Sequence, residues 1–570
     1  MKTLSVSCHI ILTTAVLLLT APVSAAALTI DAGQAQIKTV GAIQQGAWNL
    51  WSNGEWGDYV QVDQAGAYKL EIEAFGSPAS GVWPRVTLNV DGDPVADVKI
   101  ESRDLKLFTF RLPLSVGVHS LTLVFSNDTR TATEDRNLYL KRMTISPADG
   151  QVEPRLGKES VWQNNWAQQE KVKEQQVLSE ADRSIEKFRK EDAVVSVKDS
   201  SGKAIPGADI KVELKRHEFL YGSNIYGFDR TGNPVDDETY KRRFAELFNF
   251  ATTALYWRNY EPKPGQPNYD YTDKVVAWCR DHGIRVKGHP LLWANPDGIA
   301  PWIQGLPSPA QQRQRLTGLL TRYRGRIEFW EVVNEPGHWA DLKIDDPYRW
   351  AHDLDPAGHL IVNDSNVLAD GFPDFYHLLQ RAIDSQVPFD GIGIQAHEPE
   401  YLRFPLSSVQ SILEHYAHLG KDLYITEFTP ESSGQPMKKA LVPGEVWDEK
   451  AQADYAVRFY TVCFASPAVK GITWWDLSDR NSWRQNGGLL RADLSPKPAY
   501  LALEQLIHEK WTTQLQAQSD QAGNYSFRGF RGSYVITVQY NGRKAQQEFT
   551  LNAAGPKTLQ VVVPEKADSP

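Results

Sequence analysis

The chain contains very little cysteine, with only three cysteines in 570 residues. Cys8 lies in an apolar N-terminal segment, so the remainder of the chain holds only Cys279 and Cys463. Two cysteines in a chain of this length exclude a fold held together by a disulfide framework. They fall on predicted helices that are not neighbours in the order of elements given below. We therefore expect two free and largely buried thiols.

An excess of positive charge is also absent. Lys and Arg number 61 against 70 Asp and Glu, and the net charge of −9 excludes the basic surface that nucleic acids require. Residues 1–26 combine Met1-Lys2, a short apolar core and a run of small residues, which predicts a signal peptide. No later apolar run is long enough to span a membrane. We expect a secreted or periplasmic monomer with no membrane span in the mature chain.

The length predicts about three domains. Residues 28–147 alternate apolar and polar side chains between Gly and Asp-Gly turns, which indicates a β-sandwich (jelly-roll). Residues 158–192 are polar and lack Gly and Pro, which predicts a helical connector. Residues 193–216 are interpreted as a β-hairpin, and residues 512–565 contain further short strands. Neither of these two parts can bury a core alone, so we expect them to form one small β-sandwich.

Between these two parts, residues 217–509 alternate short apolar runs with helical segments such as Asp273–His282 and Ala451–Phe464. Eight strands with seven such connections are typical of a (β/α)8 barrel inserted into the small sandwich. The expected strands are Phe219–Asn224, Phe250–Leu255, Val286–Leu292, Ile327–Val333, Leu360–Asp364, Gly391–Gln395, Leu423–Glu427 and Gly471–Trp475.

Two glutamates end apolar strands of this barrel. Glu335 ends the stretch that starts at Trp330, and Glu427 ends the run that starts at Leu423. The carboxyl ends of barrel strands are where the chemistry of this fold takes place, and glycoside hydrolysis needs two carboxyl groups. Two unrelated strand-end residues would give the same pattern, so these two positions alone leave the function open.

A set of further motifs decides between these readings. Residues 217–509 resemble the family 10 glycoside hydrolases, whose characteristic activity is endo-β-1,4-xylanase. The matching stretches are Trp257–Pro262, Gly288–Trp293, Trp330–Glu335, Val362–Asp364, Gly391–His397, Ile425–Glu427, Trp474–Trp483 and Pro496–Tyr500. Each stretch is weakly specific alone, whereas all of them in this order are highly specific.

The resemblance assigns roles to these residues. Glu335 corresponds to the acid/base, which must be protonated near neutral pH, and Glu427 corresponds to the ionised nucleophile. No cofactor is implied for catalysis. The remaining positions that match sugar-binding residues are Asn334, which would bond the 2-hydroxyl, and His289, Trp293, Gln395, His397, Trp475, Trp483 and Tyr256.

Some positions depart from the family pattern on the side that binds the sugar before the cleavage point. Family members usually carry Glu, Asn and Lys where this chain has Thr252, Thr253 and Tyr256. The usual His and Gln after Trp293 are Ala294 and Pro296, and the usual Tyr after Asp364 is Ser365. A larger and less polar pocket would accept a substituted sugar, so we expect a preference for decorated xylan over linear xylo-oligosaccharides.

Residues 28–147 resemble the calcium-dependent xylan-binding modules that precede many bacterial xylanases. The resemblance points to the loop that contains Asn127, Asp128, Glu134 and Asp135 as a calcium site, because oxygen ligands suit this cation. A polar loop on the edge of a sandwich would have the same composition.

The sequence therefore predicts an exported, retaining endo-β-1,4-glycanase that acts on a polysaccharide, with xylan as the expected substrate. Hydrolysis of another decorated β-glycan or β-glycoside by the same mechanism is the near alternative. The distant alternative is a carbohydrate-binding protein without catalysis, against which the retention of both glutamates argues.

Overall fold

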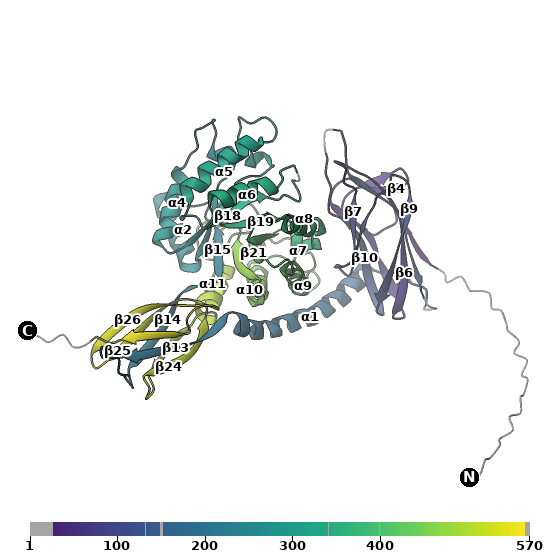
Figure 1. Ribbon diagram of the computed structural model, residues 1–570. Coiled ribbons are helices and arrows are strands. Elements are labelled where there is room, and N and C mark those ends of the chain that lie inside the picture. Colours follow the sequence, from purple (N-terminus) through teal and green to yellow (C-terminus); the bar gives the residue numbers. More distant parts are fainter. Residues whose placement is uncertain (1–26, 131–132, 149–151, 340, 398, 565–570) are drawn as a thin grey trace, which may run out of the picture.

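The computed structural model describes residues 27–130, 133–148, 152–339, 341–397 and 399–564. Three bodies are visible in Figure 1: a β-sandwich near the N-terminus, a central barrel and a second β-sandwich near the C-terminus. The predicted signal peptide lies outside the described residues. Among the described residues, no helix combines the length and the apolar character that crossing a membrane would need.

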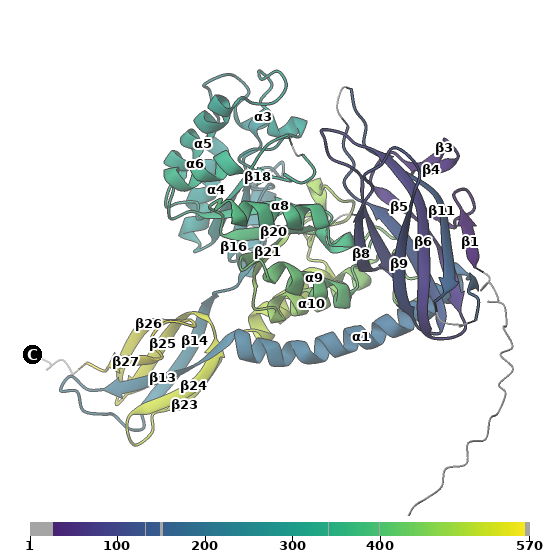
Figure 2. The ribbon, with the colours of Figure 1, turned by 45° about the vertical axis from the view of Figure 1, so that its right-hand side comes forward.

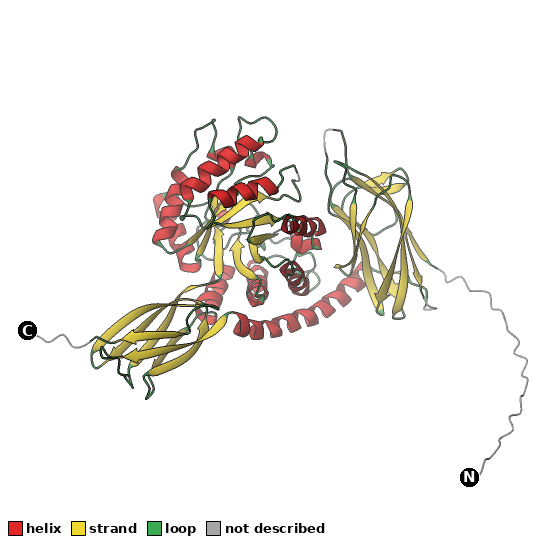
Figure 3. Ribbon diagram, viewed as in Figure 1, coloured by secondary structure: helices red, strands yellow, loops and turns green. Residues whose placement is uncertain are grey.

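The N-terminal sandwich consists of two six-stranded sheets packed over one apolar core, as Figure 3 shows. Strand β12 pairs with β5 and extends the sandwich beyond the predicted boundary at residue 147. One sheet contains β1 (Leu28–Asp31), β3 (Ala42–Gln44), β4 (Ala47–Leu50), β6 (Gly66–Ser77), β9 (Lys106–Leu114) and β11 (Asn137–Pro147). The other contains β2 (Ile37–Lys38), β5 (Gly54–Val62), β7 (Arg85–Val90), β8 (Asp93–Lys99), β10 (Gly117–Phe125) and β12 (Arg155–Leu156).

Helix α1 (Glu159–Phe188) connects this sandwich to the rest of the molecule and runs along the barrel. The helix was predicted over residues 158–192, but it ends at Phe188 because the next strand begins at Lys190. Its exposed face is polar, and the side chains that it buries include Trp166, Glu170 and Glu174.

The central domain is a closed barrel of eight parallel strands, which confirms the predicted fold class. The strands are β15 (Leu220–Asn224), β16 (Phe250–Ala254), β17 (Arg285–His289), β18 (Phe329–Asn334), β19 (His359–Asp364), β20 (Gly391–Ala396), β21 (Asp422–Phe428) and β22 (Val469–Trp474). The helices around it are α2 (Pro234–Leu247), α3 (Trp257–Tyr260), α4 (Asp270–Asp281), α5 (Pro309–Tyr323), α6 (Asp345–Leu354), α7 (Val367–Asp370), α8 (Pro373–Asp384), α9 (Leu406–Ala417), α10 (Glu449–Ala465) and α11 (Pro498–Gln505).

Local sequence signals explain where several of these helices begin. Ser308 and Gln311 form a capping box at the start of α5, and Asp448 caps α10 through the backbone N–H of Ala451. Proline occupies the first turn of α2, α5, α8 and α11, where its missing N–H is tolerated.

The C-terminal sandwich is built from both flanks of the barrel. In one sheet, β13 (Lys190–Lys198) lies between β24 (Asn524–Phe530) and β27 (Thr558–Val562). In the other sheet, β14 (Asp209–His217) lies between β23 (Gln514–Gln518) and β25 (Gly532–Tyr540), and β26 (Arg543–Leu551) pairs with β25. One apolar core joins the two sheets, so the predicted composite sandwich is confirmed. The predicted β-hairpin over 193–216 is wrong, because β13 and β14 lie in different sheets. Their predicted pairing with the C-terminal strands is nevertheless present.

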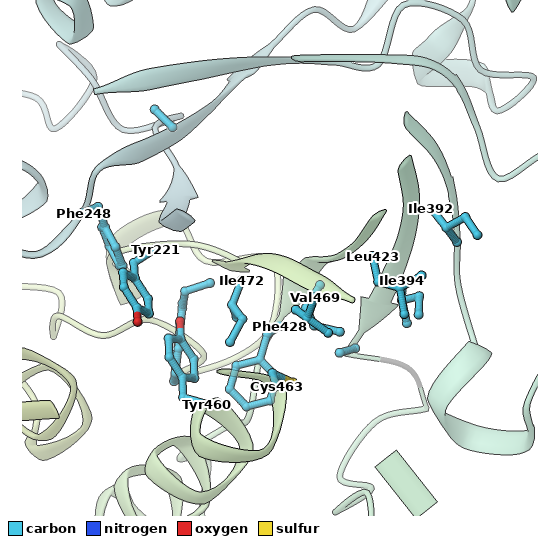
Figure 4. Close-up of a cluster of buried hydrophobic side chains, with 14 of the residues drawn as sticks. Tyr221, Phe248, Ile392, Ile394, Leu423, Phe428, Tyr460, Cys463, Val469 and Ile472 are labelled. Atoms are coloured by element: carbon cyan, nitrogen blue, oxygen red, sulfur yellow. The ribbon is translucent and has the colours of Figure 1, made fainter. Parts of the chain in front are cut away.

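Both cysteines are free and buried, as predicted. Cys279 lies on α4 and Cys463 on α10. Figure 4 shows Cys463 beside Phe428 and Val469, between α10 and the barrel strands. Burial raises the pKa of Cys279 to about 12, so this thiol is unreactive near neutral pH.

The composite sandwich generates a prediction. Removing residues 512–570 deletes the partner strands of β13 and β14 and exposes the apolar side chains of Val195, Val212 and Ile210. We expect the truncated chain to aggregate. Size-exclusion chromatography and a melting curve test this expectation, and a monomer with an unchanged melting temperature would show that the two flanks are independent.

Candidate active site

The two predicted catalytic glutamates lie at the carboxyl ends of β18 and β21, on the same end of the barrel. Glu335 has a φ of 53°, a left-handed backbone conformation that non-glycine residues rarely adopt. Strained conformations and strand irregularities concentrate at functional sites. The strand pairing around this end shifts register between Glu331 and Asn334, between Ile394 and Gln395, and between Ile425 and Phe428.

The carboxyl group of Glu335 is surrounded by hydrogen-bond donors. Trp293 and Trp339 each donate an indole N–H to its Oε2, at 3.1 and 3.2 Å. Gln395 donates to its Oε1 at 2.9 Å. Burial and the nearby carboxylate of Asp364 nevertheless raise the pKa of Glu335 to about 7. Glu335 can therefore hold a proton near neutral pH and transfer it to a substrate.

Glu427 is connected to Glu335 through two side chains. Nε2 of His397 lies 3.4 Å from Oε2 of Glu427 and 3.2 Å from Oε1 of Gln395. Burial lowers the pKa of His397 to about 3, so the ring is neutral. Nδ1 of His397 is buried without a hydrogen-bond partner among the described residues, which favours the tautomer that carries its proton on Nε2. Because Gln395 also donates to Glu335, a continuous chain joins the two glutamates.

Asn363 fixes the position of Asn334. Its Nδ2 donates to Oδ1 of Asn334 at 3.0 Å and lies 3.3 Å from both Glu331 and Glu427. This bond uses the carbonyl oxygen of Asn334 and leaves its Nδ2 as the donor for a sugar hydroxyl. The predicted contact with the 2-hydroxyl requires a donor or acceptor at this place.

A third carboxylate, Glu331, lies beneath the glutamate pair. It is fully buried, with Nζ of Lys287 at 2.8 Å and Nδ1 of His289 at 2.6 Å. Burial raises the pKa of Glu331, but these two partners outweigh burial and lower the pKa to about 2. Burial, together with the charges of Glu331 and Glu335, raises the pKa of Glu427 well above that of an ordinary glutamate, although Lys287 and the hydrogen bond from Asn363 lower it. The ammonium of Lys287 therefore favours ionisation at Glu427, and Asp364 favours protonation at Glu335.

One group of side chains here could hold a metal ion. Ligand atoms of His289, Glu331 and Glu427 all lie within 4.8 Å of one another. The ammonium of Lys287 already contacts Glu331 and supplies the positive charge that a cation would bring. Catalysis without a cofactor stays the prediction for this site.

Aromatic side chains form one wall in front of Glu427. The ring of Tyr256 lies 5.6 Å from His289 and 6.1 Å from Trp293, and its hydroxyl is 3.3 Å from Nε2 of His289. Trp475 lies 5.3 Å from His289 and 5.5 Å from Tyr226. The structure thus brings these predicted residues together and adds Tyr226, which lies two residues beyond the end of β15.

The positions that depart from the family pattern contribute differently to this wall. Thr252 and Thr253 are fully buried in β16, and neither hydroxyl has a hydrogen-bond partner among the described residues. Ala294 is also buried, and Pro296 begins a short 3-10 turn. The ring of Tyr226 packs against Tyr256 at 6.1 Å. The wall is therefore aromatic rather than charged.

Trp483 lies at the rim and is 55% exposed, with its ring 4.6 Å from His397. Asp476 anchors this segment, because it accepts hydrogen bonds from the backbone N–H of Trp483 at 2.7 Å and from Asn224 at 2.8 Å. Trp474 is fully buried in the core.

The other side of Glu335 carries residues that the sequence reasoning gave no role. Asp364 accepts from the backbone N–H of Gly337 at 2.7 Å and lies 2.5 Å from Nδ1 of His338. The ring of His338 stacks on Phe372 at 4.4 Å. Asp364 is the last residue of β19 and His338 lies four residues beyond the end of β18, so their position near strand ends was the available signal.

Comparisons with known proteins agree with this geometry. Residues 214–506, more than half of the chain, match the sequence model described as "Glycosyl hydrolase family 10". The chain belongs to glycosyl hydrolase family 10. Residues 69–156 match the model described as "Ca-dependent carbohydrate-binding module xylan-binding". Both resemblances inferred from the sequence are thereby confirmed.

Several curated proteins are similar to this chain over part of their length. Anti-sigma-I factor RsgI6 of Acetivibrio thermocellus is 28% identical over 68% of this chain and 50% of its own length. Endo-1,4-beta-xylanase 2 of Arabidopsis thaliana is 27% identical over 63% of this chain and 33% of its own length. The chain thus spans half or less of these two relatives. Xylanase 10B of Thermotoga petrophila RKU-1, solved with xylobiose, is 25% identical over 51% of this chain and 95% of that chain, with a TM-score of 0.44.

The side-chain oxygens of the candidate calcium loop differ in whether they already accept a hydrogen bond. Oδ1 of Asn127 accepts from the backbone N–H of Arg85 at 2.8 Å, and Oε2 of Glu134 accepts from that of Ser80 at 2.7 Å. Oδ1 of Asp128 is buried without a hydrogen-bond partner among the described residues. Burial and the neighbouring Asp135 raise the pKa of Asp128 to about 6. A cation would neutralise this acidic pair, so Asp128 and Asp135 fit calcium.

Calcium binding can be tested on the whole protein. We expect a chelator to weaken binding to insoluble xylan, because it leaves Asp128 and Asp135 facing each other, while hydrolysis of small soluble substrates is unchanged. Pull-down on xylan and hydrolysis of an aryl xylobioside measure the two effects. Xylan binding that survives excess EDTA would contradict the assignment.

The raised pKa of Glu335 also predicts a stability effect. The folded state keeps the proton up to pH about 7, whereas an unfolded glutamate loses it near 4.5. This carboxyl therefore costs stability increasingly as the pH rises from about 4.5 to 7. Glu335→Gln should stabilise the fold by on the order of 1–3 kcal/mol at pH 8 and little at pH 4.

Thermal unfolding at the two pH values measures this difference. Glu414→Gln on the exposed face of α9 is the matched control and should show no pH-dependent gain. An equal effect of Glu335→Gln at both pH values would refute the raised pKa.

Proposed function

We propose that this protein is an exported, retaining endo-1,4-β-xylanase. The observation that carries the proposal is the pair of glutamates at the barrel mouth, joined through Gln395 and His397. The match to a xylan-binding module supports xylan as the substrate. Several relatives that are named endo-1,4-beta-xylanases support it as well. Export is proposed from the signal-peptide pattern of residues 1–26.

In the first step, a carboxylate oxygen of Glu427 attacks the anomeric carbon and forms a covalent glycosyl ester. The proton of Glu335 passes to the glycosidic oxygen, which leaves with the departing sugar. Asn363 donates to Glu427, and Nε2 of His397 lies 3.4 Å from it, so both side chains hold the attacking group in place. Asn334 is positioned for the 2-hydroxyl of the sugar under attack.

In the second step, Glu335 is ionised and accepts a proton from water. The resulting hydroxide oxygen bonds to the anomeric carbon, and the ester bond to Glu427 breaks. The anomeric configuration is retained because the carbon is inverted twice. Glu335 keeps the proton that it took from water and is then ready for the next cycle.

The two glutamates can be distinguished by variants. Glu427→Ala should abolish the release of reducing sugar from xylan and from aryl xylosides, because no covalent intermediate forms. Glu335→Ala should lose xylan hydrolysis but retain the first step on substrates with good leaving groups. Azide should then rescue this variant and give a β-glycosyl azide, identified by NMR. Recovery of the α-azide would reverse the assignment.

The aromatic wall also supports a preference for decorated substrates. The family lysine at position 256 would donate a charge-assisted hydrogen bond of roughly 1.5–3 kcal/mol, which Tyr256 does not provide. A less polar wall costs binding of plain xylose but tolerates a side group. We propose decorated xylan as the better substrate, with another bulky β-glycoside as the alternative.

This preference predicts a higher kcat/KM on side-chain-bearing oligosaccharides than on matched linear ones. Tyr256→Lys should improve the linear series by about tenfold, consistent with one charged hydrogen bond. Kinetics on both series measure the effect. Faster hydrolysis of the linear series by the parent enzyme, without a gain in Tyr256→Lys, would contradict the proposal.

A further inference from the structure

The N-terminal sandwich contacts the barrel at the end that carries its candidate calcium loop. Arg85 begins β7, and its Nη1 pairs with Oδ1 of Asp374 in α8 at 2.7 Å. Its Nε pairs with Asp97 of β8, also at 2.7 Å. The backbone N–H of the same Arg85 is held by Asn127 of the loop. Arg85 therefore contacts both the candidate calcium loop and the barrel.

The opposite end of β7 and β8 is also fixed. Asp91 accepts a hydrogen bond from Nε1 of Trp162 in α1 at 2.7 Å. Asp93 accepts from Ser408 of α9 at 3.3 Å and pairs with Lys173 of α1 at 3.3 Å. Contacts at both ends of one sheet edge define the orientation of the sandwich as well as its position.

Helix α1 also holds the sandwich in position, and Figure 2 shows this helix running beneath the barrel to the sandwich. Glu174 forms two hydrogen bonds with Arg403 at 2.6 and 2.7 Å, and accepts from the backbone N–H of Leu406 at 3.0 Å. Glu170 accepts from Ser407 at 2.6 Å. Both glutamates are buried, and a buried charge that lost its partner would cost several kcal/mol. The helix is therefore packed on the barrel through these contacts and is not a flexible linker.

The contact at Asp374 lies beside the catalytic cleft. Phe372 precedes α8 and stacks on His338, which lies three residues after Glu335. His338 in turn contacts Asp364, the carboxylate that raises the pKa of Glu335. The proposed mechanism assigns the sugar attacked by Glu427 to the side of the aromatic wall that contains Tyr256, and the leaving sugar to this other side of Glu335.

We infer that the N-terminal sandwich extends the cleft on the leaving-group side, so that one xylan chain occupies both the barrel and the module. The inference rests on the proposed function, because it takes a β-1,4-linked xylan chain as the occupant. A module on a flexible linker would bind a separate chain and would not need buried ion pairs along α1. A fixed module beside the acid/base gains affinity from a chain that reaches both sites.

Binding stoichiometry tests this inference directly. The full-length Glu427→Ala variant, with calcium present, is titrated calorimetrically with linear xylo-oligosaccharides of increasing length. Xylotriose should fill the module and the cleft separately, with two molecules per protein. Long oligosaccharides should bind one per protein, at least tenfold more tightly.

Charge reversal at the interface provides the specific control. Asp374→Arg should remove the affinity gain for long oligosaccharides and leave xylotriose binding unchanged, and the added change Arg85→Asp should restore the gain. Asp384→Arg, at the exposed end of the same helix, should have no effect. Melting temperatures check that each variant is folded.

Two long chains per protein, a single site with the same affinity for all lengths, or an unaffected gain in Asp374→Arg would each overturn the inference. These outcomes are independent of the proposed activity. If the parent enzyme failed to hydrolyse xylan, the proposed function would fall, whereas the stoichiometry would still show whether one chain bridges the two sites.

Discussion

The arrangement of charge at the barrel mouth depends on one constraint: three carboxyl groups are buried close together with one permanent cation. Lys287 contacts Glu331 and favours the ionised form of Glu427. Asp364 lies on the opposite side and favours a proton on Glu335. The low dielectric of the site amplifies both effects. In the proposed mechanism, the same residue type acts as the nucleophile at one strand end and as the acid at another.

The rest of the fold holds this charge arrangement in place. Irregular strand pairing occurs next to Asn334, Gln395 and Glu427, where regular pleating would direct some side chains away from the cleft. The barrel is inserted in a sandwich whose sheets combine strands that precede the barrel with strands that follow it. The chain segments that enter and leave the barrel are therefore held together. Helix α1 adds a second attachment through Glu174 and Arg403.

Much of this could be predicted from the sequence, because the eight barrel strands are apolar runs that end in motif residues, and two of these ends carry the glutamates. The pairing of residues 193–216 with the C-terminal strands was predicted, but the β-hairpin was wrong because β13 and β14 lie in different sheets, which local patterns do not reveal. The roles of Tyr226 and His338 were missed because each acts through a neighbour in space. The rigid contact of Arg85 with Asp374 has no sequence signature at all.

The most direct test of this account is the protonation state of Glu335 itself, followed by infrared or carbon NMR titration of the carboxyl groups. We expect a buried carboxyl proton that is lost with a midpoint near pH 7 and whose signal disappears in Glu335→Gln. Lys287→Met should raise the pKa of Glu427 further, because it removes the cation that lowers this pKa. Complete ionisation of all three glutamates below pH 5, or a signal that persists in Glu335→Gln, would contradict the account.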